Sequence, residues 1–218
     1  MRHMLGCFAL LLTVAAPRPA LAQMLGVPVV QSPFAGSGFT VAANFGTTDG
    51  ANTYGLAASW APANGRFLLS GGAGALDPDA GDAAVTWGMR AMVPVMGVRG
   101  GSVGVAAFGG LGGASESGVT ELRVPVGVTA GYRRALGASR GAAVYVTPFY
   151  SWARLSGNEG DARSAGVFRV SLGIDVAVLP SLGVTLGYET GDEASAGDPG
   201  PVGGVFGVGL SYALQRNR

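Results

Sequence analysis

Two stretches of this chain, residues 121–132 and 167–179, alternate apolar and polar residues with a period of two. That period is typical of a β-strand with one apolar face, whereas an amphipathic helix repeats about every 3.6 residues. After residue 22, no segment has the apolar length of a membrane-spanning helix, and no long window keeps helical spacing. The sequence therefore predicts an all-β chain. The apolar positions of the two stretches are Leu122, Val124, Val126, Val128, Ala130, Tyr132, Phe168, Val170, Leu172, Ile174, Val176 and Val178.

Eight further segments carry a shorter or weaker form of the same alternation. Together with the two long stretches they predict ten strands. The count falls to eight if the two shortest segments, 67–69 and 103–105, are not strands. The eight segments are residues 39–45, 54–60, 67–69, 85–93, 103–105, 144–152, 184–188 and 206–212.

The connections between these segments form two alternating sets that differ in charge. Because antiparallel strands reverse direction at every connection, the two sets belong to opposite ends of the sheet. The first set, with its flanks, holds nearly every acidic residue and comprises 46–52, 76–82, 110–118, 156–164 and 190–203. The second set has basic side chains and tight-turn sequences and comprises 64–66, 99–101, 133–141 and 180–183. We therefore expect one acidic end.

The polar face of the predicted strands carries too little charge to meet water. Only 12% of the residues are charged, and most polar-face positions are Gly, Ala, Ser or Thr. A soluble barrel packs apolar side chains inward, whereas a membrane barrel turns them toward lipid and closes so that no strand edge is left unpaired. The sequence therefore predicts a closed antiparallel transmembrane up-and-down β-barrel. Its girdle of interfacial aromatic residues is expected to include Trp60, Trp87, Tyr132, Tyr150, Trp152, Tyr188 and Tyr212.

The first 22 residues have the pattern of a secretory signal peptide. Arg2 and His3 precede an apolar run, and the small residues of the Ala20-Leu21-Ala22 triplet predict cleavage before Gln23. Residues 23–36 are expected to form either a periplasmic lead-in or a plug inside the barrel. Residues 37–218 are expected to form the barrel itself.

With these features the chain resembles the small bacterial outer-membrane β-barrel proteins of the OmpA and OmpX kind, without a periplasmic domain. The last predicted strand, 205–212, is similar to the C-terminal signal that such proteins present to the barrel-assembly machinery, although six residues follow Tyr212. The resemblance implies Sec-type export to the cell outer membrane, contact with lipid and lipopolysaccharide, and periplasmic termini. It places the acidic loops outside the cell, where an unknown protein partner could bind them.

Charged residues on the lumen face are the strongest candidates for functional residues. A charge there is costly unless it is paired or hydrated. In one interpretation an internal salt-bridge network, with Asp175 and Glu121 as acceptors, closes a structural or surface-interaction barrel. In the alternative, a narrow Arg-lined pore passes small anions or polar solutes, although inward Phe108, Tyr145 and Phe149 argue partly against a wide channel. The lumen-lining charged residues are Arg90, Arg123, Arg169, Asp175 and Glu121.

Few other residues of the sequence could support catalysis or metal binding. Beyond residue 22 there is no His, Cys or Lys, and the membrane-barrel enzymes that the chain resembles use an active-site His, so we expect no catalytic activity. The loop acids could form a carboxylate dyad or a Ca²⁺ site but lack the spacing of a known motif, and we predict neither metal nor cofactor. A net charge of +1 argues against nucleic acid as a partner. The acidic residues assigned to the outer loops are Asp77, Asp79, Asp82, Asp192 and Glu193.

Overall fold

The computed structural model describes residues 32, 34, 37–79, 81–97, 102–116, 118–136, 141–157, 162–194 and 203–214. The predicted signal peptide, 1–22, lies outside the described residues, and of the segment 23–36 only Ser32 and Phe34 are described. Within the described ranges, no helix is long and apolar enough to cross a membrane.

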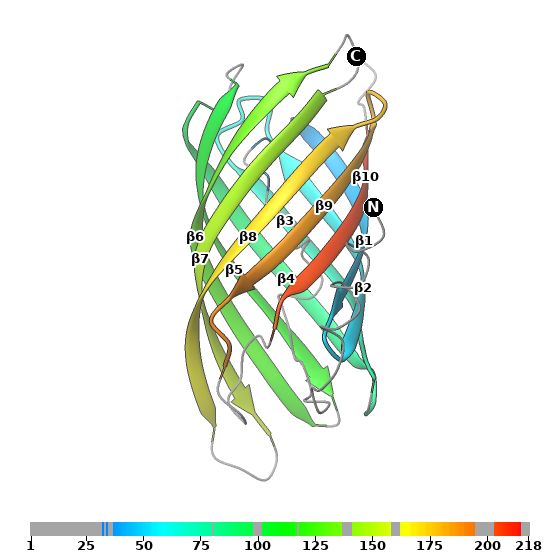
Figure 1. Cartoon of the computed structure of the whole chain (residues 1–218), viewed down its shortest axis with the longest axis vertical. Helices are drawn as coiled ribbons and strands as arrows, with labels where there is room; N and C mark the ends of the chain where they lie inside the picture. The colour runs from blue at the N-terminus through cyan, green and yellow to red at the C-terminus, as the bar shows by residue number, and fades with distance from the viewer. Residues whose placement is uncertain are drawn as a thin grey trace, which may run out of the picture.

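The described residues form a closed barrel of ten antiparallel strands (Figure 1). Each strand pairs with its neighbours in sequence, and β1 pairs with β10 to close the ring. The prediction of ten strands is confirmed, and the alternative of eight is wrong because both short segments belong to full strands. The strands are β1 (Gly38–Thr48), β2 (Ala51–Ala61), β3 (Leu68–Pro78), β4 (Ala84–Met96), β5 (Val103–Glu116), β6 (Val119–Ala135), β7 (Gly141–Ser156), β8 (Arg163–Ala177), β9 (Leu182–Gly191) and β10 (Val205–Leu214).

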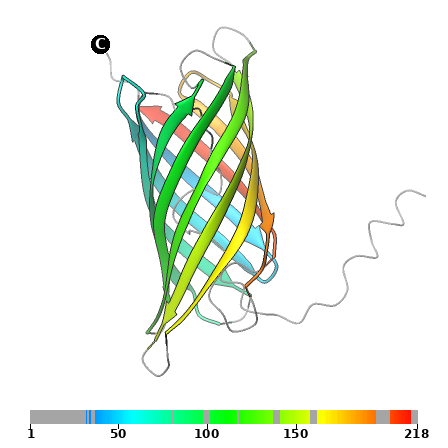
Figure 2. The same ribbon diagram turned by 90° about the vertical axis from the view of Figure 1, so that its left-hand side faces the viewer.

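The barrel has two ends, which we name by their connections. The turn end carries the β2–β3, β4–β5, β6–β7 and β8–β9 connections, and the loop end carries the other five. Strands β5 to β8 have 14 to 17 residues, whereas β1, β2, β3, β9 and β10 have 10 or 11. About 9 to 11 tilted residues cross a bilayer, so the long strands exceed that length. Figures 1 and 2 show β7 and β8 projecting beyond the shorter strands at the loop end.

Several connections of the loop end are shorter than the sequence analysis predicted. The β1–β2 connection is the two-residue turn Asp49-Gly50, with Gly50 at a φ of 89°, which favours glycine. The β5–β6 connection is residues 117–118, because the predicted loop 110–118 belongs mostly to β5. Asp77, assigned to a loop, lies within β3. In residues 109–113, where four of the five positions are glycine, alternation does not mark the strand that continues through them.

Glycines inside the strands provide room for aromatic rings. A Cβ built on Gly173 of β8 would lie 2.2 Å from the Tyr145 ring, and one on Gly127 of β6 would lie 2.5 Å from the Phe149 Cβ. The Tyr145 ring therefore occupies space that only a glycine on β8 leaves open, and a Cβ on Gly127 would also lie 2.9 Å from the Phe108 ring. The glycine content of the chain therefore supports close packing inside the barrel.

Candidate functional site

The outer surface of the barrel is its apolar face. Leu56, Val126 and Leu172 are half or more exposed, as are many other large apolar side chains of alternate strand positions. The inward positions between them include Thr86, Thr129, Thr147 and Ser171, each with 0% exposure. An exterior of exposed aliphatic side chains around a polar interior suits hydrocarbon outside and not water. The chain is a transmembrane β-barrel.

The seven residues predicted for the aromatic girdle all lie on outward positions of this surface. Trp60, Tyr132 and Tyr212 lie near the turn end of their strands, and Trp87, Trp152 and Tyr188 near the loop end. Tyr150 lies two residues before Trp152 on the same face of β7. Aromatic rings at both ends of the strands match the two interfaces of a bilayer.

The charged residues predicted for the lumen do lie inside the barrel. Arg90, Arg123, Arg169 and Glu121 are at most 6% exposed, and Asp175 is half-buried. The lumen is therefore the candidate functional site. Its contents differ at three levels between the loop end and the turn end.

At the loop end, two arginines are paired with buried glutamates. The Arg123 Nε donates to Glu121, two residues earlier on the same face of β6. The Arg169 Nε donates to the Glu189 Oε1 of β9 at 2.6 Å. Arg169 also donates to the backbone carbonyls of Asp192 and Gly203, at 3.0 and 2.8 Å, which ties both ends of the β9–β10 connection to the wall.

The second acceptor was therefore wrongly predicted. Glu189, and not Asp175, is the partner of Arg169, while Glu121 is an acceptor as expected. Extending the alternation of residues 184–188 by one position places Glu189 on the inward face, so its position in the lumen, though not its partner, could be predicted from the sequence. Asp175 instead accepts hydrogen bonds from Thr185 at 2.7 Å and from Tyr145 at 3.4 Å.

At mid-height, aromatic and apolar side chains fill the lumen. Phe108 and Phe149 contact each other edge to face, with ring centroids 6.3 Å apart, and pack with Met92 in one buried cluster. The Arg90 guanidinium carbon lies 5.8 Å from the Phe108 ring centroid. Thr147 donates to Thr129 at 2.9 Å across β7 and β6. This level narrows the interior of the barrel with well-packed side chains.

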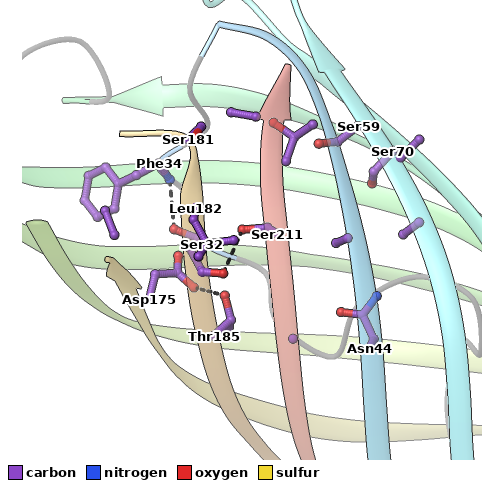
Figure 3. Close-up of a pocket in the computed structure, with 18 of the residues that line it drawn as sticks. Ser32, Phe34, Asn44, Ser59, Ser70, Asp175, Ser181, Leu182, Thr185 and Ser211 are labelled. Carbon is purple, nitrogen blue, oxygen red and sulfur yellow. Dashed lines mark hydrogen bonds between the residues drawn. The ribbon is translucent and has the colours of Figure 1, made fainter. Parts of the chain in front are cut away.

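At the turn end, the lumen contains a cavity of about 310 Å³. Arg90 and Asp175 both line it, together with serine, threonine and asparagine side chains from β1, β2, β3, β9 and β10. Figure 3 shows these polar groups pointing into the cavity, with Asp175 and Thr185 on one side and Ser59 and Ser70 on the other. Phe34 also lines this cavity; it packs against Gly104, and its ring lies 5.0 Å from the Arg133 guanidinium carbon.

The acidic residues predicted for the outer loops all lie at the loop end. Asp79 and Asp82 are exposed in the β3–β4 connection, near Asp77 at the end of β3. Asp192 and Glu193 are exposed just after β9. In the part of the chain that the structure describes, no three acidic, His or Cys side chains gather closely enough to hold a metal ion.

No family model matches this chain, and no curated protein matches it. Three solved structures are similar to it at low identity. The KdgM porin in complex with disordered oligogalacturonate is 10% identical, covers 81% of this chain and 99% of its own, and has a TM-score of 0.44. The NanC porin is 10% identical and covers 81% and 100%, with a TM-score of 0.39. Ail, the attachment invasion locus protein of Yersinia pestis, is 12% identical and covers 82% and 100%, with a TM-score of 0.31.

Proposed function

We propose that this chain is an integral outer-membrane β-barrel with a structural or surface-interaction role and without catalytic activity. The observation that carries the proposal is the filled lumen. Two of its arginines are paired with buried glutamates, and the Phe108–Phe149 cluster occupies mid-height. A network of paired charges and packed rings stabilises the barrel and leaves little room for a solute to pass from one end to the other.

The two ends of the barrel suit different surroundings. The loop end presents exposed carboxylates, which favour contact with lipopolysaccharide through bridging cations or with a protein partner outside the cell. An even number of strands puts the start of β1 and the end of β10 at the turn end, which we assign to the periplasm. In this orientation β10 is the strand offered to the barrel-assembly machinery. Signal cleavage before Gln23 and Sec-type export belong to the same proposal.

The segment 23–36 acts, in this proposal, as a plug of the periplasmic mouth and not as a free lead-in. The contacts of Phe34 with Gly104 and Arg133 support this choice, as does a hydrogen bond from the Ser32 side chain to Asp175. Ser32 and Phe34, the two described residues of this segment, both line the cavity at the turn end.

We expect the refolded chain to produce no discrete openings in a planar lipid bilayer. Replacing both Phe108 and Phe149 by alanine is expected to create openings, because it removes the mid-height cluster. The matched control is Phe168→Ala, which removes an outward ring of the same size. Heat-modifiable migration on a gel verifies that each variant is folded before recording.

The second candidate function is a narrow pore for small anions, which the turn-end cavity and the cation of Arg90 favour. Anion-selective openings of the unmodified chain, reduced by Arg123→Ser or Arg169→Ser, would contradict the closed lumen and establish this candidate. Silence of both the unmodified chain and the alanine double variant would also contradict our account, because the cluster would then not be what closes the lumen.

A further inference from the structure

A row of polar side chains crosses four neighbouring strands inside the turn-end cavity. Residue pairing in the sheet aligns Thr40 with Ser59, Ser59 with Ser70, and Ser70 with Arg90. All four side chains line the cavity of about 310 Å³. The row therefore presents three hydroxyl groups beside one guanidinium group on a single wall.

Arg90 is the member of this row that most needs a partner. It is only 6% exposed, and its Nε and Nη1 have no hydrogen-bond partner among the described residues. The Ser70 Oγ is likewise buried without a described partner. A cation left unpaired in a barrel interior is costly, and contact with the Phe108 ring at 5.8 Å compensates only a small part of that cost.

The acid of the same cavity does not fill this role. Asp175 of β8 lies on the other wall of the cavity, where it is paired with Thr185 of β9 in the sheet. Its carboxylate accepts hydrogen bonds from Thr185 and Tyr145. The arginines of the loop end differ from Arg90, since Arg123 and Arg169 each have a glutamate partner. The cavity therefore combines one cation that lacks an acid partner with donors that can complete the coordination of an anion.

We propose that the turn-end cavity binds a small oxyanion, a phosphate or a carboxylate, through Arg90 with help from Ser70 and Ser59. Guanidinium is the side-chain group that binds these anions most strongly, and hydroxyl groups donate to their remaining oxygen atoms. Leu179, Pro180 and Ser181 of the β8–β9 turn line the cavity, and Leu68, which also lines it, packs against the cluster of Phe108, Phe149 and Met92. The site thus faces the periplasmic mouth, and it goes beyond the structural role proposed above.

The test is the thermal unfolding midpoint of the detergent-folded barrel, titrated separately with sodium phosphate and sodium acetate at constant ionic strength set by sodium chloride. A ligand that binds only the folded state raises the midpoint in proportion to the logarithm of its concentration. We expect the unmodified chain to respond to at least one of the two anions. A response to phosphate alone or to acetate alone identifies which group the cavity prefers.

Arg90→Met is expected to fold, since it removes an unpaired charge and keeps an apolar stem, and to weaken the apparent affinity by roughly tenfold to a hundredfold. Ser70→Ala should weaken it by a smaller factor and provides an independent test. The matched control is Arg66→Met, which removes an equal charge from an exposed turn and should leave the response unchanged. The proposal would be contradicted if the unfolding midpoint of the unmodified chain did not change with either anion. It would also be contradicted if Arg90→Met responded to the anions as the unmodified chain does. Conductance is measured separately, so this result does not depend on whether the lumen is closed.

Discussion

Replacing Glu189 by alanine is expected to lower the free energy of unfolding by about 3–5 kcal/mol, because removal of one partner leaves a buried charge uncompensated. Its partner Arg169 has 0% exposure, so water cannot replace the lost carboxylate without a rearrangement of the wall. The change should also loosen the β9–β10 connection that Arg169 holds through two backbone carbonyls. The measurement is the urea dependence of unfolding from lipid vesicles.

The double variant Arg169→Met/Glu189→Leu separates charge from packing. It removes both charges and keeps most of the side-chain volume, so it should recover a large part of the stability lost in Glu189→Ala. Glu193→Ala, at an exposed position just after β9, should change stability by no more than about 0.5 kcal/mol. A loss below about 1 kcal/mol in Glu189→Ala would show that the pair does not organise this end of the lumen.

Replacing Leu172 by arginine is expected to destabilise the barrel in vesicles by about 2–4 kcal/mol, because Leu172 is an outward side chain in the interior of β8. The same change at Ser164, also exposed on β8 but close to its loop end, should cost about 0–1 kcal/mol. The depth dependence is the signature of a bilayer. An exposed position in water would tolerate arginine equally well at both sites, so equal and small effects would contradict the membrane assignment.

Alternation with a period of two was sufficient to predict the barrel from the sequence. It placed Arg90, Arg123, Arg169 and Glu121 in the lumen, because on a strand the facing of a side chain depends only on its position along the alternation. The ends of the strands were harder to predict. Alternation cannot be followed where nearly every position is Gly, as in 109–113, so the predicted strand was too short and its connection too long.

The partners of the lumen charges could not be predicted in the same way. Which acid reaches which arginine depends on the register between strands, and register is set by pairing along the whole sheet. Glu189 meets Arg169 because of how β8 and β9 are aligned, and no local feature of either strand reveals it. The row from Thr40 to Arg90 also depends on register, since it joins residues from four different strands.

The most direct test of the membrane assignment uses the three tryptophans of the chain, all of which lie outward near the ends of their strands. The measurement is tryptophan fluorescence after folding into vesicles whose lipids carry bromine at defined depths. We predict strong quenching, and stronger quenching by bromine near the lipid head group than at the centre of the bilayer, because Trp60, Trp87 and Trp152 belong to the interfacial girdle. Fluorescence that is insensitive to brominated lipid at every depth would show that this surface faces water, and it would contradict the assignment of the barrel to a membrane.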